Sequence, residues 1–372
     1  MPTSLFSPFS LRKLTLANRI VVSPMCQYSA VDGRATDWHI IHWGQLLQSG
    51  AGMFTVEATA VSSIGRITYG CLGLYDDECE QALGERMAIA RANAPAIPVA
   101  LQLAHSGRKG SSHVPWEGGQ LIPADQGGWM PLAPSAIAMR DDEPAPKPID
   151  AATLVQIRRE YADAAGRAER IGIDALELHM AHGYLLNEFL SPLSNQRNDA
   201  YGGSFDRRIR FPLEVFDAVR RVWPQDKPLG VRISATDWVD GGWTIEDSIA
   251  LVQRLQAAGC DWIDVSSGGI SPAQKIALGP GYQVPLARAI RAATSMPTMT
   301  VGLITDARQA DAIVKSNDAD LVAMARAMLW NPRWPWHAAA VLGAQVPAPR
   351  QYWRSSPRDA GNVIADAKIG MR

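Results

Sequence analysis

The sequence predicts an α/β fold, a single (β/α)8 TIM barrel with a long excursion after its third strand. Eight short runs of apolar and β-prone residues recur along the 372 residues, and segments of helical periodicity separate them. Strands that alternate with helices indicate a parallel sheet with helices outside it. The count of eight and the chain length favour a closed barrel. We expect one domain that spans residues 1–372.

The expected strands follow the chain in order, at residues 19–25, 52–58, 98–105, 175–182, 229–235, 262–268, 297–303 and 321–327. Between them, apolar stripes at helical spacing predict helices over 151–171 and 211–222. A further helix follows Thr244, a plausible N-cap with Asp247 three residues later, and ends at Gly259. A doubly wound sheet is the alternative, but the first strand lacks the G-x-G-x-x-G that favours it.

Residues 106–150 interrupt this alternation with a stretch rich in Gly and Pro that also contains Trp116 and Trp129. Loops of this length are usually functional or disordered. The tryptophans favour an ordered lid over the barrel mouth, meaning the carboxyl ends of the strands. A solvated insertion is the alternative.

Composition excludes several classes of protein. A net charge of −1 gives no whole-chain attraction to nucleic acid. No apolar run is long enough to cross a membrane, and we expect no signal peptide. The four cysteines form no C-x-x-C pair, which is typical of a cytoplasmic protein without disulfides or a zinc ribbon.

Polar residues near the ends of the expected strands mark a site, because barrel chemistry lies there. Arg232 and Gln102 fall within strands, where each needs a polar partner. The partner of Arg232 is either a carboxylate (Asp237, Asp264 or Glu177) or a polar cofactor across the barrel top. After the last two strands, Gly302 and Arg326 stand where barrels often bind phosphate.

The segment "HMAHGY" places His179, His182 and Tyr184 at the end of the fourth strand. A spacing of three fits neither the helical nor the strand pattern of metal ligands, so we expect no metal. Packing remains the alternative for each histidine alone. Together, two imidazoles can hold one oxyanion while a phenol delivers a proton nearby.

Long motifs along the chain resemble the old yellow enzyme family of FMN-dependent ene-reductases, in its thermophilic-like, xenobiotic-reductase-type branch. The resemblance extends from "NRIVVSPMCQYS" through "QLAHSGRKG", "HMAHGYLLNEFLSPLSNQRNDAYGGS" and "GYQVPLA" to "ARAMLWNPRWPW". It implies an FMN-binding barrel in which NADPH or NADH reduces the flavin and an activated alkene accepts hydride in a ping-pong cycle. Enones, enals, maleimides and nitro compounds are the implied acceptors.

The resemblance also implies a role for each matching residue. The implied flavin contacts are Ser23, Pro24, Met25, Cys26, Ala58, Gln102, Arg232, Gly302, Leu303, Ala325 and Arg326. The implied substrate contacts are Tyr28, Lys109, His179 and His182, with Tyr184 as the proton donor.

The C-terminal tail, residues 345–372, resembles a segment from which a neighbouring subunit's arginine completes the site, so Arg354 predicts a homodimer or larger oligomer. A flavin protein that senses redox state through Cys26, without turnover, and a metal hydrolase are the alternatives.

Overall fold

The computed structural model describes residues 4–357 and 359–367, and its centre is a closed barrel of eight strands. Every neighbouring pair in the barrel is parallel, in the order β10-β11-β12-β3-β4-β5-β8-β9. The barrel strands are β3 (Ile20–Val22), β4 (Met53–Ala60), β5 (Val99–Ala104), β8 (Ala175–Met180), β9 (Leu229–Ser234), β10 (Trp262–Ser266), β11 (Thr298–Thr300) and β12 (Leu321–Met324). All eight predicted strands are therefore confirmed, and so is the TIM-barrel class.

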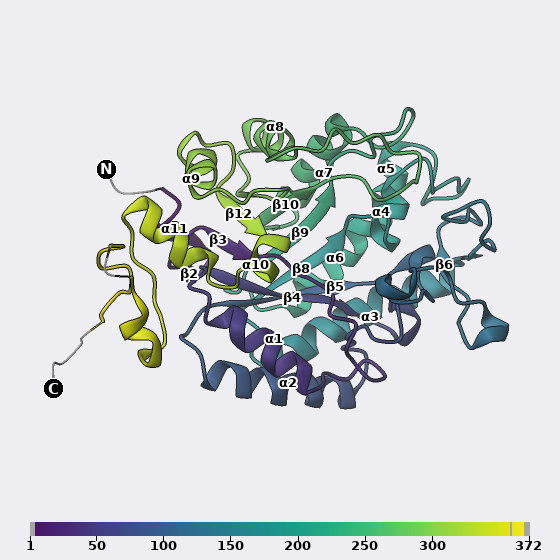
Figure 1. The fold of residues 1–372 in the computed structure, drawn as a ribbon. Coiled ribbons are helices and arrows are strands. Elements are labelled where there is room, and N and C mark those ends of the chain that lie inside the picture. Colours follow the sequence, from purple (N-terminus) through teal and green to yellow (C-terminus); the bar gives the residue numbers. More distant parts are fainter. Residues whose placement is uncertain (1–3, 358, 368–372) are drawn as a thin grey trace.

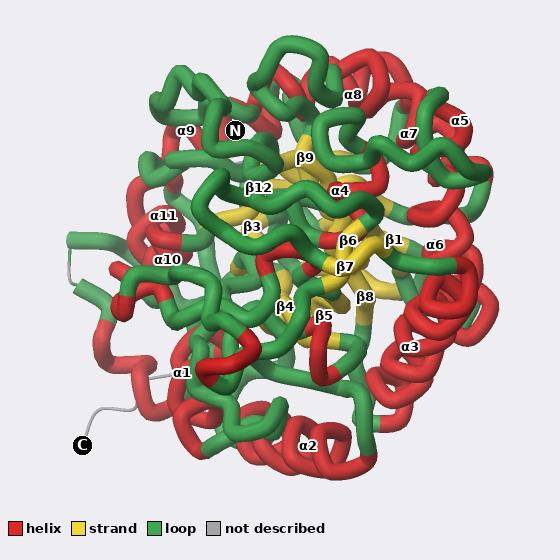
Figure 2. Tube along the Cα trace, turned by 90° about the vertical axis from the view of Figure 1, so that its right-hand side faces the viewer, coloured by secondary structure: helices red, strands yellow, loops and turns green. Residues whose placement is uncertain are grey.

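Helices surround the strands in a ring, with the strands in the middle when the molecule is seen end-on (Figure 2). The helices are α1 (Asp37–Leu47), α2 (Asp77–Ala92), α3 (Ala151–Arg170), α4 (Leu185–Leu190), α5 (Phe205–Arg208), α6 (Arg210–Val222), α7 (Ile245–Ala257), α8 (Val284–Thr294), α9 (Ala307–Lys315), α10 (Arg326–Trp330) and α11 (Trp334–Leu342). The predicted start of α7 is confirmed, because Thr244 and Asp247 form a capping box. Gly259 follows the helix with φ +91°, as a C-terminal glycine should.

Several predicted strands are shorter than expected, including the first, predicted over 19–25 and observed as Ile20–Val22, and for the last two the reason is local. Residues 297–303 contain only β11, because Gly302 (φ +130°) and Leu303 (φ 52°) turn the chain out of the extended conformation. Residues 321–327 contain only β12, because the chain leaves the strand at Ala325 and enters α10 at Arg326. Gly302, Leu303 and Ala325 thus lie outside the strands and Arg326 begins α10, so their backbone N–H groups are not used by the sheet.

The bottom of the barrel is closed by an antiparallel hairpin, β1 (Phe9–Leu11) with β2 (Leu14–Leu16). Its buried leucines pack in one cluster with Trp262 of β10. Trp262 fills the barrel interior so closely that a Cβ on Gly230 would meet its ring at 2.0 Å, so residue 230 must be glycine. Hydrophobic side chains thus fill this end of the barrel.

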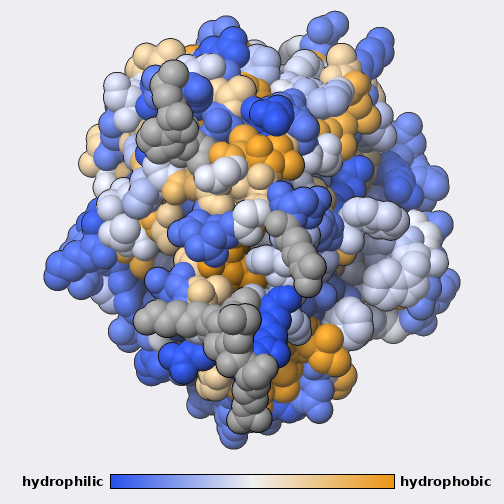
Figure 3. Space-filling view, turned by 60° about the vertical axis from the view of Figure 1, so that its left-hand side comes forward, coloured by the Kyte–Doolittle hydropathy of each residue, from blue (hydrophilic) through white to orange (hydrophobic). Residues whose placement is uncertain are grey.

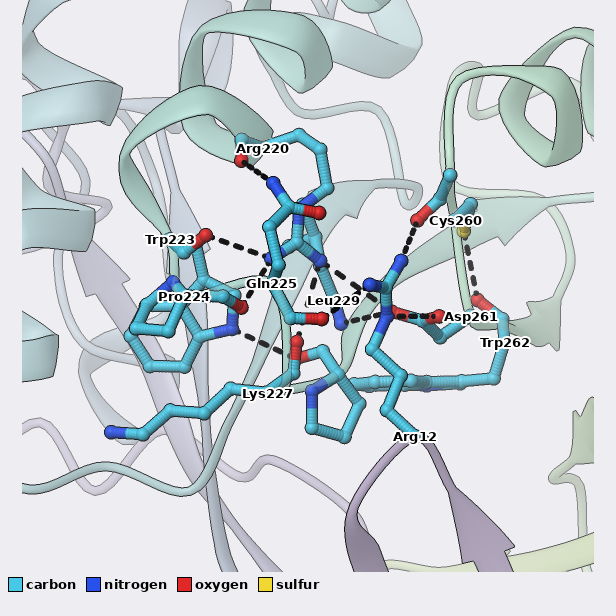
Figure 4. A network of polar contacts seen from close by, with 12 residues as sticks. Arg12, Arg220, Trp223, Pro224, Gln225, Lys227, Leu229, Cys260, Asp261 and Trp262 are labelled. Carbon is cyan, nitrogen blue, oxygen red and sulfur yellow. Dashed lines mark hydrogen bonds and ion pairs between the residues drawn. The ribbon is translucent and has the colours of Figure 1, made fainter.

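A network of hydrogen bonds and ion pairs connects the β1–β2 hairpin to the barrel (Figure 4). Arg12, at the hairpin turn, pairs with Asp261 at 2.6 Å and donates to the carbonyl of Gly259. The same carboxylate accepts the backbone N–H of Leu229 at 2.8 Å and lies 3.6 Å from Arg220. One aspartate therefore ties the hairpin to β9 and α6.

The excursion over residues 106–150 is an ordered structure, as predicted. It contains a small parallel sheet, β6 (Leu132–Ala133) with β7 (Lys147–Pro148), and three 3₁₀ turns: η2 (Gly107–Lys109), η3 (Pro115–Glu117) and η4 (Ala124–Gln126). The remaining turns of this kind are η1 (Ser63–Gly65) and η5 (Arg350–Ser355). The indole of Trp129 donates to the carbonyl of Ile64, whereas Trp116 is 69% exposed. Figure 1 shows the excursion around β6 at the end of the molecule opposite the C-terminal tail.

Candidate active site

Three predicted catalytic side chains lie together at the end of β8. The rings of His179 and His182 have centroids 5.0 Å apart, and His179 meets Tyr184 edge-to-face at 4.8 Å. The two nearest imidazole nitrogens, His179 Nε2 and His182 Nδ1, are 3.2 Å apart. The spacing of three residues therefore brings two ring nitrogens close together, which a regular strand would not do because residues three apart on a strand point to opposite faces.

The close approach depends on an unusual backbone turn. His182 has φ +60°, in the left-handed region that non-glycine residues rarely occupy, and Gly183 follows with φ +74°. A Cβ on Gly269 would stand 2.6 Å from the His182 backbone, so two glycines are needed where these loops cross. Lys109 joins the loops, since its Nζ donates to the carbonyls of His182 at 2.6 Å and Gly269 at 2.5 Å. This backbone strain at a predicted site is typical of functional positions.

Burial sets the protonation of these groups. Desolvation, followed by the charge of Arg232, lowers the pKa of both His179 and His182 well below its usual range, so both rings are neutral. Desolvation raises the pKa of Tyr184, which keeps its hydroxyl protonated. It also lowers the pKa of Lys109 to about 8. The cluster therefore contains two neutral imidazoles and a protonated phenol.

The partner of Arg232 within the chain is Asp264, whose Oδ2 lies 3.3 Å from Nε. The contact lacks hydrogen-bond geometry, and both Asp264 oxygens and the Nε are buried without such a bond. Asp237, one of the predicted alternatives, instead accepts the hydroxyl of Ser191 and the backbone N–H of Trp243. The guanidinium is thus only partly satisfied inside the protein.

Gln102 lies on β5, directly opposite Glu177 of β8. Its amide nitrogen donates to Glu177 Oε1 at 2.8 Å, and the residue is 2% exposed. Desolvation, with the neighbouring charge of Asp264, raises the pKa of Glu177 to about 8. The predicted need of Gln102 for a polar partner is therefore met, at least on its N–H side, by this carboxyl group.

A cavity of about 160 Å³ gathers the predicted phosphate residues. Its lining includes five predicted cofactor contacts: Arg232, Gly302, Leu303, Ala325 and Arg326. The sequence reasoning did not single out three further lining residues, Ser266, Tyr282 and Gln283. Tyr282 and Gln283 belong to the motif "GYQVPLA", which is part of the family resemblance. The motif could therefore have pointed to these two residues, although no role was predicted for them.

The cavity suits the phosphate end of a flavin nucleotide. Two arginines face one space, a donor set that favours an anion. A Cβ on Gly302 would lie 3.0 Å from Gln283 Nε2 and from the Tyr282 ring, so glycine leaves room for a ligand to approach the backbone. The hydroxyl of Ser23 is also buried without a hydrogen bond in the described protein. These unsatisfied groups fit a polar cofactor.

The segment after β3 carries the other predicted flavin contacts, Ser23 to Cys26. The N–H of Ser23 donates to the carbonyl of Met324 at 3.0 Å, and the side-chain amide of Gln27 donates to the carbonyl of Met25, so the backbone of this segment is held at both ends. Burial raises the pKa of the Cys26 thiol well above its usual range. Cys26 is therefore a neutral thiol, poorly suited to nucleophilic attack.

Pro24 lies in the same segment, half-buried between Ser23 and Met25. Ala58 lines a small space of about 10 Å³ with Cys71 and Tyr184, so it lies close to the histidine–tyrosine cluster.

A larger cavity of about 240 Å³ opens from the cluster toward the excursion. Tyr28, Lys109 and Tyr184 line it together with Arg108 and Arg140 from the excursion. Tyr28 has φ 52° and meets Trp116 edge-to-face at 5.8 Å. Two predicted substrate contacts, Tyr28 and Lys109, therefore share a space with the predicted proton donor Tyr184, and the excursion supplies one wall. His179 and His182 are not among the residues that line this cavity.

Arg354 lies apart from these cavities, exposed on η5. The tail packs on its own α11: the ring of Tyr352 contacts that of Trp336 at 6.1 Å, and Arg333 stacks on both rings.

Within residues 4–357 and 359–367, no three His, Cys, Asp or Glu side chains are grouped to hold a metal ion. In the same ranges, no helix has the length and apolar character to cross a membrane.

A closed parallel barrel with a histidine–tyrosine cluster and an arginine-lined cavity beyond its strands is typical of TIM-barrel enzymes that bind phosphorylated ligands. The chain belongs to the NADH:flavin oxidoreductase / NADH oxidase family, whose model matches residues 4–344. It is an enzyme of the old yellow enzyme type, an NAD(P)H-dependent flavin oxidoreductase.

Individual relatives agree with this assignment. An NADPH dehydrogenase of Geobacillus thermodenitrificans (strain NG80-2) is 46% identical over 95% of this chain and 99% of its own. The structure of morphinone reductase in complex with tetrahydroNAD matches with TM-score 0.74 and 27% identity, over 98% of this chain and 97% of its own. A 2-naphthoyl-CoA reductase complex matches with TM-score 0.81 but 22% identity, over 92% of this chain and 52% of its own, and supports the fold alone.

Proposed function

We propose that this protein is an FMN-dependent ene-reductase that reduces activated alkenes with NAD(P)H in a ping-pong cycle. Enones, enals and maleimides are the proposed acceptors, and nitro compounds are further candidates. One observation carries the proposal: His179 Nε2 and His182 Nδ1 converge to 3.2 Å beside the protonated phenol of Tyr184. Bound FMN would supply the hydride.

The chain would hold FMN at both ends. Arg326 and the backbone at Gly302 would hold its phosphate, because both line the arginine-containing cavity. Arg232 lines the same cavity and would place positive charge beside the flavin ring. Ser23 to Cys26, Ala58 and Gln102 would complete the contacts, as the family resemblance implies.

Substrate activation would come from the histidine–tyrosine cluster. The two imidazoles would hold the carbonyl or nitro oxygen, on which negative charge grows as hydride adds to the β-carbon. Tyr184 would deliver a proton to the α-carbon, and burial keeps that proton on its oxygen until then. Lys109 would keep the strained His182–Gly183 turn in place through its two carbonyl contacts, and Tyr28 would line the acceptor's path.

A single barrel mouth would serve both substrates in turn, and this predicts ping-pong kinetics. We further propose NADPH as the favoured donor, since the 46% identical relative is named an NADPH dehydrogenase. A redox-sensing flavin protein without turnover is the alternative, but the raised pKa of Cys26 argues against a reactive sensor thiolate.

The test is direct. The purified protein should show the absorbance of a non-covalent flavin, and extraction should release FMN. Steady-state assays with NADPH and cyclohexenone should give parallel double-reciprocal lines. A colourless protein, or a yellow one that never reduces cyclohexenone or N-methylmaleimide, would refute the proposal.

We also propose that the active unit is a homodimer or a larger homo-oligomer in which Arg354 serves a neighbouring mouth. Arg354 lines neither cavity of its own chain, and the face that carries the tail shows hydrophobic side chains among hydrophilic ones (Figure 3). Tyr352 and Val341 on this part of the chain are 43% and 50% exposed. Light scattering that finds a fully active monomer would exclude this arrangement.

A further inference from the structure

The two site histidines belong to a hydrogen-bond chain whose proton directions can be deduced. The backbone N–H of Ala181 lies 3.2 Å from His179 Nδ1. A backbone N–H can only donate, so Nδ1 must accept and carries no proton. Because burial keeps the ring neutral, the single proton of His179 stands on Nε2. His179 is thus fixed as a donor toward His182.

His182 is neutral as well, but its contacts allow two tautomers. Its Nδ1 faces His179 Nε2 at 3.2 Å, and its Nε2 faces the hydroxyl of Ser266 at 2.7 Å. With the proton on Nε2, His182 donates to Ser266 and accepts from His179, so no ring N–H remains for a ligand. With the proton on Nδ1, both facing nitrogens carry protons, and they are satisfied only by an oxygen that accepts from both.

Ser266 is suited to both tautomers because a hydroxyl can donate and accept. Its hydroxyl also donates to Gln283 Oε1 in a long hydrogen bond of 3.4 Å, and that oxygen already accepts the hydroxyl of Ser267 at 2.7 Å, so the longer bond can be given up. The Gln283 amide is itself held by its bond to the carbonyl of Val301 at 2.7 Å. The proton of Ser266 is therefore available to His182 Nε2.

We propose that an oxygen ligand sets the tautomer of His182, and that Ser266 is the positioning residue that pairs with its Nε2 in both states. Without a ligand, His182 donates from Nε2 to Ser266. With an oxygen ligand, Ser266 donates to Nε2, and the Nδ1–H joins the Nε2–H of His179 on that oxygen. The ring keeps one proton throughout, since the proton lost from Nε2 is balanced by one gained on Nδ1 through exchange with water. The proposal rests on the proposed function, which brings an oxygen to this point.

Imidazole nitrogen NMR on the flavin-loaded protein tests the tautomer directly, because protonated and bare ring nitrogens have well-separated shifts. The chain has seven histidines, and His179→Ala and His182→Ala would assign the two site resonances. The probe is 4-hydroxybenzaldehyde, whose phenolate oxygen can take both donors. We expect the His182 proton on Nε2 without the probe and on Nδ1 with it. A proton that stays on Nε2 in the complex, or a wild-type protein that does not bind the probe, overturns the proposal.

Variants separate this role from simple packing. Ser266→Ala removes the hydrogen bond that orients the His182 ring, so it should weaken probe binding by roughly 3- to 10-fold, and Ser266→Thr should restore it. Ser248→Ala is the matched control, since Ser248 is buried on α7 and bonded to Ala235 and Trp243. Equal weakening in the Ser248 and Ser266 variants, or none in Ser266→Ala, contradicts the proposal. These measurements do not depend on turnover. A tautomer shift in a protein that does not reduce alkenes would refute only the proposed function. Alkene reduction by a protein without the tautomer shift would refute only this inference.

Discussion

Replacing Tyr184 by phenylalanine should slow alkene reduction selectively. The change removes one hydroxyl and keeps the ring, so the edge-to-face contact with His179 at 4.8 Å and the Lys109 ammonium 5.6 Å from the ring centroid remain possible. The structure therefore gives no reason for the variant to misfold or to displace the histidine pair. What is lost is the buried, protonated phenol beside the oxygen site.

The size of the effect follows from the chemistry of that phenol. General acids contribute roughly 10²–10⁴-fold to a rate. Burial raises the pKa of Tyr184, which makes it a weaker acid, so we expect the lower end, about 10²-fold or 2.7 kcal/mol of activation free energy. Reduction of the enzyme by NADPH needs no proton at an α-carbon and should stay near the wild-type rate.

Stopped-flow spectroscopy separates the two half-reactions, with NADPH in one experiment and cyclohexenone in the other. Tyr201→Phe is the matched control, because its hydroxyl is 3.4 Å from Glu214 and outside the described cavities, so both halves should be unchanged. If Tyr184→Phe slows both halves equally, the tyrosine is structural and the proton-donor reasoning is wrong.

Three further outcomes follow from the site. Arg326→Ala should weaken flavin binding by about 1.5–3 kcal/mol, measured by fluorescence titration of the flavin-free protein, and an unchanged affinity would remove Arg326 from the phosphate site. Cys26→Ser should shift the flavin midpoint potential in a redox titration yet leave turnover; complete loss of activity with flavin bound would instead indicate a covalent role. Glu57 is buried on β4 and accepts the backbone N–H of Gln27, next to the Ser23–Cys26 segment. Glu57→Gln should gain stability relative to wild type as pH rises, because burial raises the folded pKa of Glu57 to about 8 from 4.5, and wild-type stability falls across that window. Urea titrations at pH 5 and pH 8 measure the difference, and a pH-independent difference would contradict the raised pKa.

The local features of the fold could be predicted because each rests on neighbouring residues. Thr244, Asp247 and Gly259 begin and end α7 through bonds and backbone angles within a few positions. The eight strands could be located for the same reason, since a short apolar run is itself the signal. Strand ends were less accurate where a turn depends on backbone angles, as at Gly302 and Leu303.

The barrel, the family and many of the residues from which the candidate site is drawn could be read from the order of amino acids, whereas Ser266, Tyr282 and Gln283 were found only in the structure. How those residues pair could be read only from the folded chain. Gln102 donates to Glu177, 75 positions away, and Ser266 meets His182, 84 positions away, through strands that are brought together only in the closed barrel. Motif spacing encodes contacts along one strand or helix, whereas a hydrogen bond between strands depends on barrel register. The left-handed turn at His182 likewise could be read only from the folded chain, because Gly269 and Lys109, which are distant in sequence, pack against it and bring the two imidazole nitrogens together.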